Sequence, residues 1–134
     1  NEISGGHESI LIVDDDPVQR DVCNILLKKL GYEVTLAESG EQALDILSKD
    51  SFDLLILDMI IPDGIDGAET YARAVRLHPD QKAIIVSGYS ETDRVAKAQR
   101  LGVGAFVQKP LSKKTIALAV RKELDKAKDA EHAD

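Results

Sequence analysis

The chain has 134 residues, of which 43% are hydrophobic and 31% charged, and its formal net charge is -7. This length fits a single domain with its own core, and the acidic balance argues against direct binding of nucleic acid, which needs lysine and arginine to neutralise phosphates. No apolar run approaches the roughly 20 residues of a membrane span, so we expect no membrane contact by this domain.

Five short apolar runs alternate with amphipathic segments along the chain. The runs cover residues 10–13, 34–37, 54–57, 83–86 and 105–107. Such alternation predicts parallel strands joined by helical crossovers. The first, third and fourth runs are apolar throughout, as in strands covered on both faces, so we expect them at the centre of the sheet.

The amphipathic segments each open on a residue that commonly begins or caps a helix. The predicted starts are Asp16, Ser39, Gly67, Thr92 and Ser112. In the first helix the predicted apolar stripe is Val22, Cys23, Leu26 and Leu30. Cys23 has no second cysteine to pair with, and no signal-peptide pattern opens the chain, so we expect a cytoplasmic protein.

Reactive side chains stand at the carboxyl ends of four of the predicted strands. Asp14 and Asp15 follow the first strand, Asp58 the third, Ser87 the fourth and Lys109 the fifth. Each residue alone is more often a turn former or a solvated charge than a functional group. Because parallel strands end at one edge of the sheet, where the ligand sites of such folds lie, the group as a whole indicates a site.

The acidic members of this group predict a metal. Clustered carboxylates repel one another unless a cation lies among them. The candidate ligands are all oxygens, which favours magnesium, or manganese in its place, over zinc or copper. Asp58 comes from a central strand and is best placed to attack a phosphoryl group and form an acyl phosphate. The metal, the Lys109 ammonium group and the Ser87 hydroxyl would then stabilise charge on the phosphoryl oxygens.

Four segments resemble the response-regulator receiver family of two-component signalling. They are residues 10–17, 54–62, 84–88 and 107–110. The resemblance implies a flavodoxin-like (βα)5 three-layer sandwich with a five-stranded parallel sheet in the order 2-1-3-4-5. It places the receiver domain at residues 8–126, after a linker at 1–7 and before a tail at 127–134.

The resemblance also implies the role of each site residue. Asp58 is the phosphorylated residue, and Asp15 and Asp58 ligate magnesium directly. The backbone carbonyl of Ile60 is a further ligand, and Asp14 acts directly or through water.

On the other side of the site, the resemblance implies that Ser87 hydrogen-bonds the phosphoryl group and that Lys109 pairs with it. Ser87 and Phe106 form the switch that changes the partner surface on phosphorylation. Lys109 and Pro110 resemble the cis peptide of the family.

The implied phosphoryl donor is a histidine kinase or a histidine phosphotransfer domain. Residues 5–10 and 86–90 resemble receivers attached to hybrid sensor histidine kinases, so we expect such an origin. The loop after Pro62 is one residue longer than is common in the family. Ile60 has no polar side chain to orient water, which predicts slow self-dephosphorylation, and Gly88 leaves room for a partner's phosphohistidine.

Three other interpretations of the sequence remain. A haloacid-dehalogenase-like phosphatase also uses an aspartate nucleophile, but it needs a second aspartate where this chain has Ile60. A flavin-binding module shares the fold, but it needs a phosphate loop where this chain has three aspartates at 14–16. A receiver-like interaction module that is never phosphorylated is the third.

Overall fold

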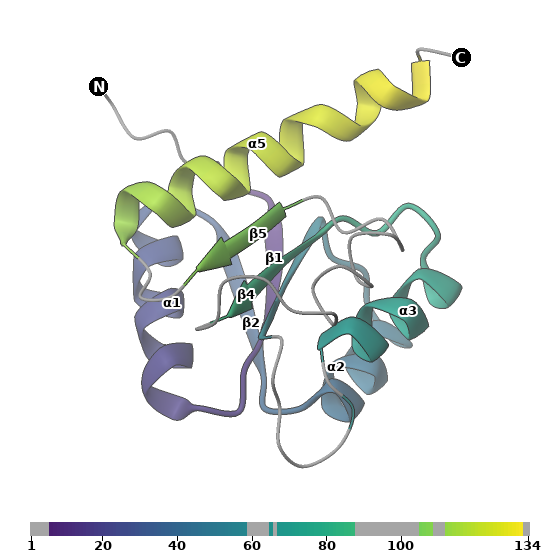
Figure 1. The fold of residues 1–134 in the computed structure, drawn as a ribbon, viewed down its shortest axis with the longest axis horizontal. Helices are drawn as coiled ribbons and strands as arrows, with labels where there is room; N and C mark the ends of the chain where they lie inside the picture. The colour runs from purple at the N-terminus through teal and green to yellow at the C-terminus, as the bar shows by residue number, and fades with distance from the viewer. Residues whose placement is uncertain (1–5, 59–64, 66, 88–104, 109–111, 133–134) are drawn as a thin grey trace.

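The computed structural model describes residues 6–58, 65, 67–87, 105–108 and 112–132. Along residues 9–87 strands and helices alternate as predicted (Figure 1). In chain order they are β1 (Ser9–Val13), α1 (Pro17–Lys29), β2 (Glu33–Ala37), α2 (Gly40–Leu47), β3 (Leu54–Asp58), α3 (Gly67–Leu77), β4 (Ala83–Ser87), β5 (Ala105–Gln108) and α5 (Lys113–His132). The helix predicted to begin at Thr92 lies outside the described residues.

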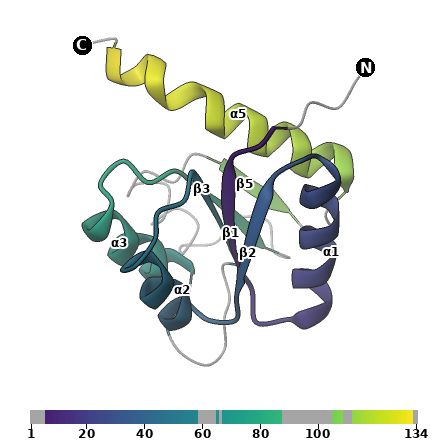
Figure 2. The ribbon, with the colours of Figure 1, turned by 180° about the vertical axis from the view of Figure 1, so that it is seen from behind.

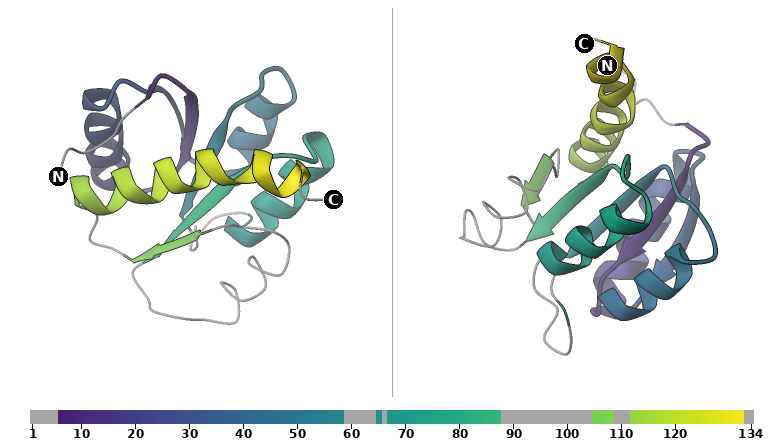
Figure 3. Two further views of the ribbon diagram at one scale, coloured as in Figure 1. Left: turned by 90° about the horizontal axis from the view of Figure 1, so that it is seen from above. Right: turned by 90° about the vertical axis from the view of Figure 1, so that its right-hand side faces the viewer.

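The five strands form one parallel sheet in the order β2-β1-β3-β4-β5. This confirms the predicted order and the central position of β1, β3 and β4. Figures 1 and 2 show α1 on one side of the sheet and α2 and α3 on the other. Helix α5 packs over β4 and β5, as the view from above in Figure 3 shows.

The two faces of the sheet carry two separate apolar clusters. Along β1, Ile10 and Ile12 join the cluster under α1 and α5, whereas Leu11 and Val13 join the cluster under α2 and α3. Successive side chains of a strand point to opposite faces, so a strand that is covered twice must be apolar at every position. This explains why the central runs of the sequence show no polar alternation.

Helix α1 begins and ends as predicted, but its buried face is different. Asp16 is the N-cap, and Gly31 follows the helix with a φ of 100°, a conformation that glycine adopts without strain. Cys23 and Leu27 are the buried residues of this helix, whereas Val22 is 38% exposed. The predicted stripe was therefore wrong at Val22 and missed Leu27. Cys23 and Leu27 are four residues apart and so lie on one face of the helix, whereas Val22 points about 100° away from Cys23 around the helix axis.

An ion-pair network joins α5 to Glu8, the residue before β1, at the edge where the strands begin. Arg121 donates to the Glu8 carboxylate at 2.7 Å and to Asp125 at 2.8 Å, and it lies 3.4 Å from the Tyr32 hydroxyl. The hydrogen bond from Arg121 lowers the pKa of Glu8 to about 2. The backbone of α5 stays helical to His132, through most of the segment predicted as a tail.

Among the residues that the structure describes, none of the helices combines the length and apolar character that crossing a bilayer requires.

Candidate functional site

Three carboxylates meet where β1 and β3 end. Val13 pairs with Leu57 in the parallel register, so Asp14 and Asp58 follow at adjacent positions of neighbouring strands. The carboxylate oxygens of Asp14, Asp15 and Asp58 lie within 4.8 Å of one another. Asp14 is 7% and Asp58 8% exposed, while Asp15 is exposed. Oxygen ligands at this spacing, with negative charge concentrated at a largely buried position, fit a hard divalent cation such as Mg²⁺.

The turn after β1 is fixed by hydrogen bonds around Asp14. Its backbone N–H donates to the Ala37 carbonyl at 3.1 Å, and its carboxylate accepts from the backbone N–H of Asp16 at 2.9 Å. The Arg20 guanidinium donates to the Asp14 carbonyl at 2.7 Å. These contacts orient one of the acidic side chains before any ligand binds, which is how supporting groups set the geometry of a metal site.

Arg20 was missed by the sequence analysis. Its backbone N–H donates to the Asp16 carbonyl, so Arg20 lies in the first turn of α1, and from there its side chain reaches back to Asp14. A basic residue one helical turn after a capping aspartate was the available signal.

Ser87 and Phe106 are placed by their backbones. Asp58 pairs with Val86 across β3 and β4, so Ser87 lies one residue farther toward the edge that carries the carboxylates. Ser87 pairs in turn with Gln108, and Phe106 pairs with Ile85. Three further predicted residues, Ile60, Gly88 and Lys109, lie outside the described part of the chain, although Lys109 directly follows β5.

The comparisons with known proteins decide what this arrangement is. The family model of the response regulator receiver domain matches residues 10–121. The chain belongs to the response regulator receiver family. It is therefore a phosphoacceptor receiver domain of two-component signalling. The match favours this interpretation over the phosphatase and flavin alternatives.

Individual relatives agree with the family match. The receiver is 39% identical over 118 residues to sporulation initiation phosphotransferase F of Bacillus subtilis, a match that covers 88% of this chain and 94% of the relative. It is 31% identical over 121 residues to the transcriptional regulatory protein GlrR of Escherichia coli, where the match covers 90% of this chain but 27% of the relative. The chain thus spans about a quarter of that longer regulator.

Solved structures give the same result. A CheY-like receiver domain protein of Methanospirillum hungatei has a TM-score of 0.86 at 29% identity, with 93% of this chain and 99% of that chain covered. TrrA of Thermotoga maritima, solved in complex with Mg²⁺-BeF, has a TM-score of 0.77 at 31% identity, with 86% of this chain and 97% of that chain covered.

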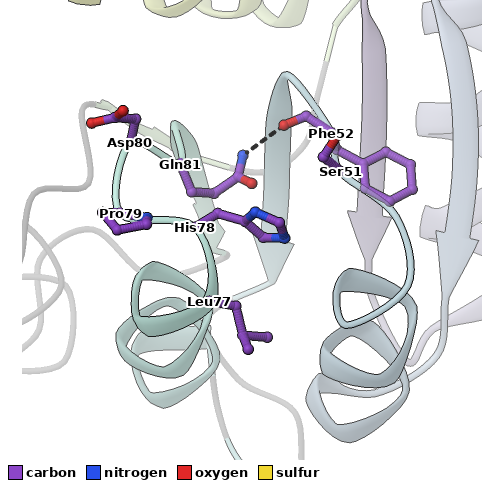
Figure 4. A pocket seen from close by; sticks show the side chains of 7 residues that line it. All are labelled: Ser51, Phe52, Leu77, His78, Pro79, Asp80 and Gln81. Carbon is purple, nitrogen blue, oxygen red and sulfur yellow. Dashed lines mark hydrogen bonds between the residues drawn. The ribbon is translucent and has the colours of Figure 1, made fainter.

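A separate pocket lies at the other edge of the receiver, where the chain enters β3 and β4. It has a volume of about 280 Å³ and is lined by Ser51, Phe52 and residues 77–81 (Figure 4). The Gln81 amide donates to the Phe52 carbonyl at 3.2 Å and to the Lys82 carbonyl at 3.0 Å, and the His78 ring contacts the Leu47 carbonyl at 2.9 Å. These polar side chains hold neighbouring loops together, at the far ends of the strands from the acidic cluster.

Proposed function

We propose that Asp58 is the phosphoacceptor of this receiver, and that Asp14, Asp15 and Asp58 hold the magnesium ion that the transfer requires. The observation that carries the proposal is the cluster itself: two buried carboxylates and one exposed carboxylate, within 4.8 Å of one another at the end of the central strands. The backbone carbonyl of Ile60 is proposed as a further ligand from the family resemblance. Manganese would satisfy the same oxygen ligands.

In the proposed reaction a carboxylate oxygen of Asp58 attacks the phosphorus atom of a phosphohistidine. The new O–P bond forms as the P–N bond to the histidine breaks, which leaves an acyl phosphate on Asp58. Asp14, Asp15 and Asp58 would hold the Mg²⁺ ion, which would supply positive charge to the phosphoryl oxygens. Asp58 is the last residue of the central strand β3, which is proposed to position the nucleophile, and the Ser87 hydroxyl and Lys109 ammonium group are proposed to bind the phosphoryl oxygens from the β4 and β5 side.

Intact mass spectrometry after incubation with acetyl phosphate and Mg²⁺ tests the acceptor. We expect wild type to gain one phosphoryl group and Asp58→Asn to gain none. Asp45→Asn is the matched control, since Asp45 has a 69% exposed side chain on α2, and it should be phosphorylated like wild type. If wild type takes up no phosphoryl group, the proposal falls and an interaction module that is never phosphorylated becomes the better interpretation.

We further propose that the phosphoryl state is long-lived. Ile60, two residues after the acceptor, offers no polar atom to orient an attacking water. The decay of the purified phosphoprotein, followed by mass spectrometry, measures this lifetime. Decay within seconds would contradict the proposal.

The proposed phosphoryl donor is a histidine kinase or a histidine phosphotransfer domain, and the proposed compartment is the cytoplasm. We also propose that residues 8–126 are the receiver domain of a hybrid histidine kinase. Gly88 is proposed to leave space for the donor's phosphohistidine, and Gly88→Leu should slow transfer from the donor. An unchanged transfer rate would reject this role. The gene around this segment tests the hybrid origin, because a kinase core encoded upstream supports it and a start codon just before Asn1 refutes it.

Phosphorylation is proposed to move the Ser87 side chain toward the phosphoryl group and to turn Phe106 inward, so that the surface formed by the predicted fourth helix, β5 and α5 changes. The support is the register of the sheet, in which the backbone of Ser87 lies on β4, the strand next to Asp58, and the backbone of Phe106 lies on β5, one strand farther out. Amide chemical shifts of β5 and α5 before and after phosphorylation test it. Shifts confined to the ends of β1 and β3 would contradict it.

A further inference from the structure

The segment that leaves Asp58 is fastened to α2 shortly before α3 begins. The backbone N–H of Ile65 donates to the Glu41 carboxylate at 3.1 Å, across 24 residues of sequence. Ile65 is the last of the three residues between Pro62 and Asp66, where the family commonly has two, and α3 begins two residues later at Gly67. The longer loop therefore has an attachment point on a neighbouring helix.

The packing around Gly40 supports the same attachment. A Cβ atom at Gly40 would overlap the Thr70 hydroxyl and would lie 2.6 Å from Cγ1 of Ile65. Thr70 is fully buried in α3, and Gly40 is a buried residue at the start of α2. The Ile65 and Thr70 side chains thus rest directly on the backbone of α2, in space that only glycine leaves. The contact is both a hydrogen bond and close packing.

The helix that receives the loop is itself well fixed at this end. Ser39 caps α2 by accepting from the backbone N–H of Gln42, and the Gln42 side chain accepts from the backbone N–H of Glu38 at 2.6 Å. The first turn is also the favourable place for the Glu41 carboxylate, because the helix dipole is positive there. Figure 2 shows α2 beside α3, and the two helices are in contact.

We propose that Gly40, Glu41 and Ile65 form a clamp that positions the metal-side loop of the receiver and thereby strengthens magnesium binding. The inference rests on the proposed function, since it assigns positioning residues to that same site. Asp58 fixes one end of the segment on β3, and the clamp fixes the other end on α2. A segment held at both ends loses less conformational entropy when it contributes a ligand to a metal, so the metal binds more tightly.

Isothermal titration calorimetry with Mg²⁺, which measures the Kd of the full chain for the metal, tests the clamp. Glu41→Ala removes the acceptor of the Ile65 N–H, and we expect the Kd for Mg²⁺ to rise about fivefold, the factor that one net hydrogen bond supplies. Glu41→Gln keeps an acceptor oxygen and should show a smaller rise. Gly40→Ala should also raise the Kd for Mg²⁺, because its added methyl group would push the Ile65 side chain away while the Glu41 acceptor stays in place.

Asp45→Asn is the matched control, because it removes one negative charge from the same helix at an exposed site paired with Lys49. Its Kd for Mg²⁺ should equal that of wild type. An unchanged Kd in Glu41→Ala, or an equal rise in Asp45→Asn, overturns the clamp.

A kinetic readout separates positioning from a purely structural role. With acetyl phosphate as donor, Glu41→Ala should need about fivefold more Mg²⁺ for half-maximal phosphorylation, while the rate at saturating Mg²⁺ approaches that of wild type. A rate that stays low at every Mg²⁺ concentration would overturn the clamp. Wild type is measured in parallel, and if it is not phosphorylated, the proposed function fails. If wild type is phosphorylated but Glu41→Ala needs no more Mg²⁺ than wild type for half-maximal phosphorylation, the clamp alone is rejected.

Discussion

Replacing Asp58 with asparagine should stabilise the receiver when Mg²⁺ is absent. The carboxylate oxygens of Asp14 and Asp58 lie within 4.8 Å of each other, and both side chains are more than nine-tenths buried. Two like charges at that distance repel by about 3 kcal/mol at an effective dielectric constant of about 20. Asp15 is exposed and adds less, because water screens its charge.

The net gain should be smaller than the repulsion itself. Asp14 and Asp58 each make further polar or electrostatic contacts, and an amide replaces only part of those that Asp58 makes. We therefore expect Asp58→Asn to raise the free energy of unfolding by about 1 to 3 kcal/mol in EDTA. Urea unfolding at pH 7, followed by circular dichroism, measures this difference.

Magnesium should stabilise wild type more than it stabilises Asp58→Asn. A ligand that binds only the folded state at a hundred times its Kd adds about 2.7 kcal/mol, and Asp58→Asn, which lacks one of the proposed carboxylate ligands, should gain less. Asp45→Asn, at an exposed position, should change stability by no more than about 0.5 kcal/mol and respond to Mg²⁺ like wild type. The reasoning is refuted if Asp58→Asn is less stable than wild type in EDTA, or if both gain equally from Mg²⁺.

Three further predictions concern the framework around the site. Arg121 lowers the pKa of Glu8 to about 2, so this ion pair stabilises the fold fully above pH 4.5 and loses its effect as the pH falls through 2. Glu8→Gln should lower the free energy of unfolding by about 1 kcal/mol at pH 7, since the Glu8 side chain is only 25% exposed. In urea unfolding the difference from wild type should shrink below pH 4.5, and a difference that stays constant with pH would contradict this prediction. Gly31→Ala should cost about 1 to 2 kcal/mol in thermal unfolding, because Gly31 has a φ of 100° and its added Cβ would lie 2.5 Å from the Gly6 carbonyl oxygen; an unchanged midpoint would argue against this strain. Leu57→Ala should cost about 2 to 5 kcal/mol in urea unfolding, since Leu57 is fully buried in β3, and a loss below 1 kcal/mol would mean that the core relaxes around the cavity.

The sequence by itself determined the elements and most of the acidic site. The apolar runs predicted every described strand to within one residue at each end, and the runs are clearest in β1, β3 and β4 because burial on both faces of a sheet leaves no polar position. Asp16 and Ser39 marked helix starts through local hydrogen bonds to the next turn, which depend on sequence neighbours alone. Asp14 and Asp58 could be grouped because parallel strands end at a common edge.

Only the tertiary structure decided the contacts between segments distant in the sequence. Which face of α1 is buried depends on how the helix lies on the sheet, so the pattern selected Val22 where the fold buries Leu27. The bond from Ile65 to Glu41 joins the end of a loop to another helix across 24 residues, and no local signal encodes such a pairing. Propensity, capping and burial pattern act over a few residues, whereas the supports of this site form only when the layers pack together.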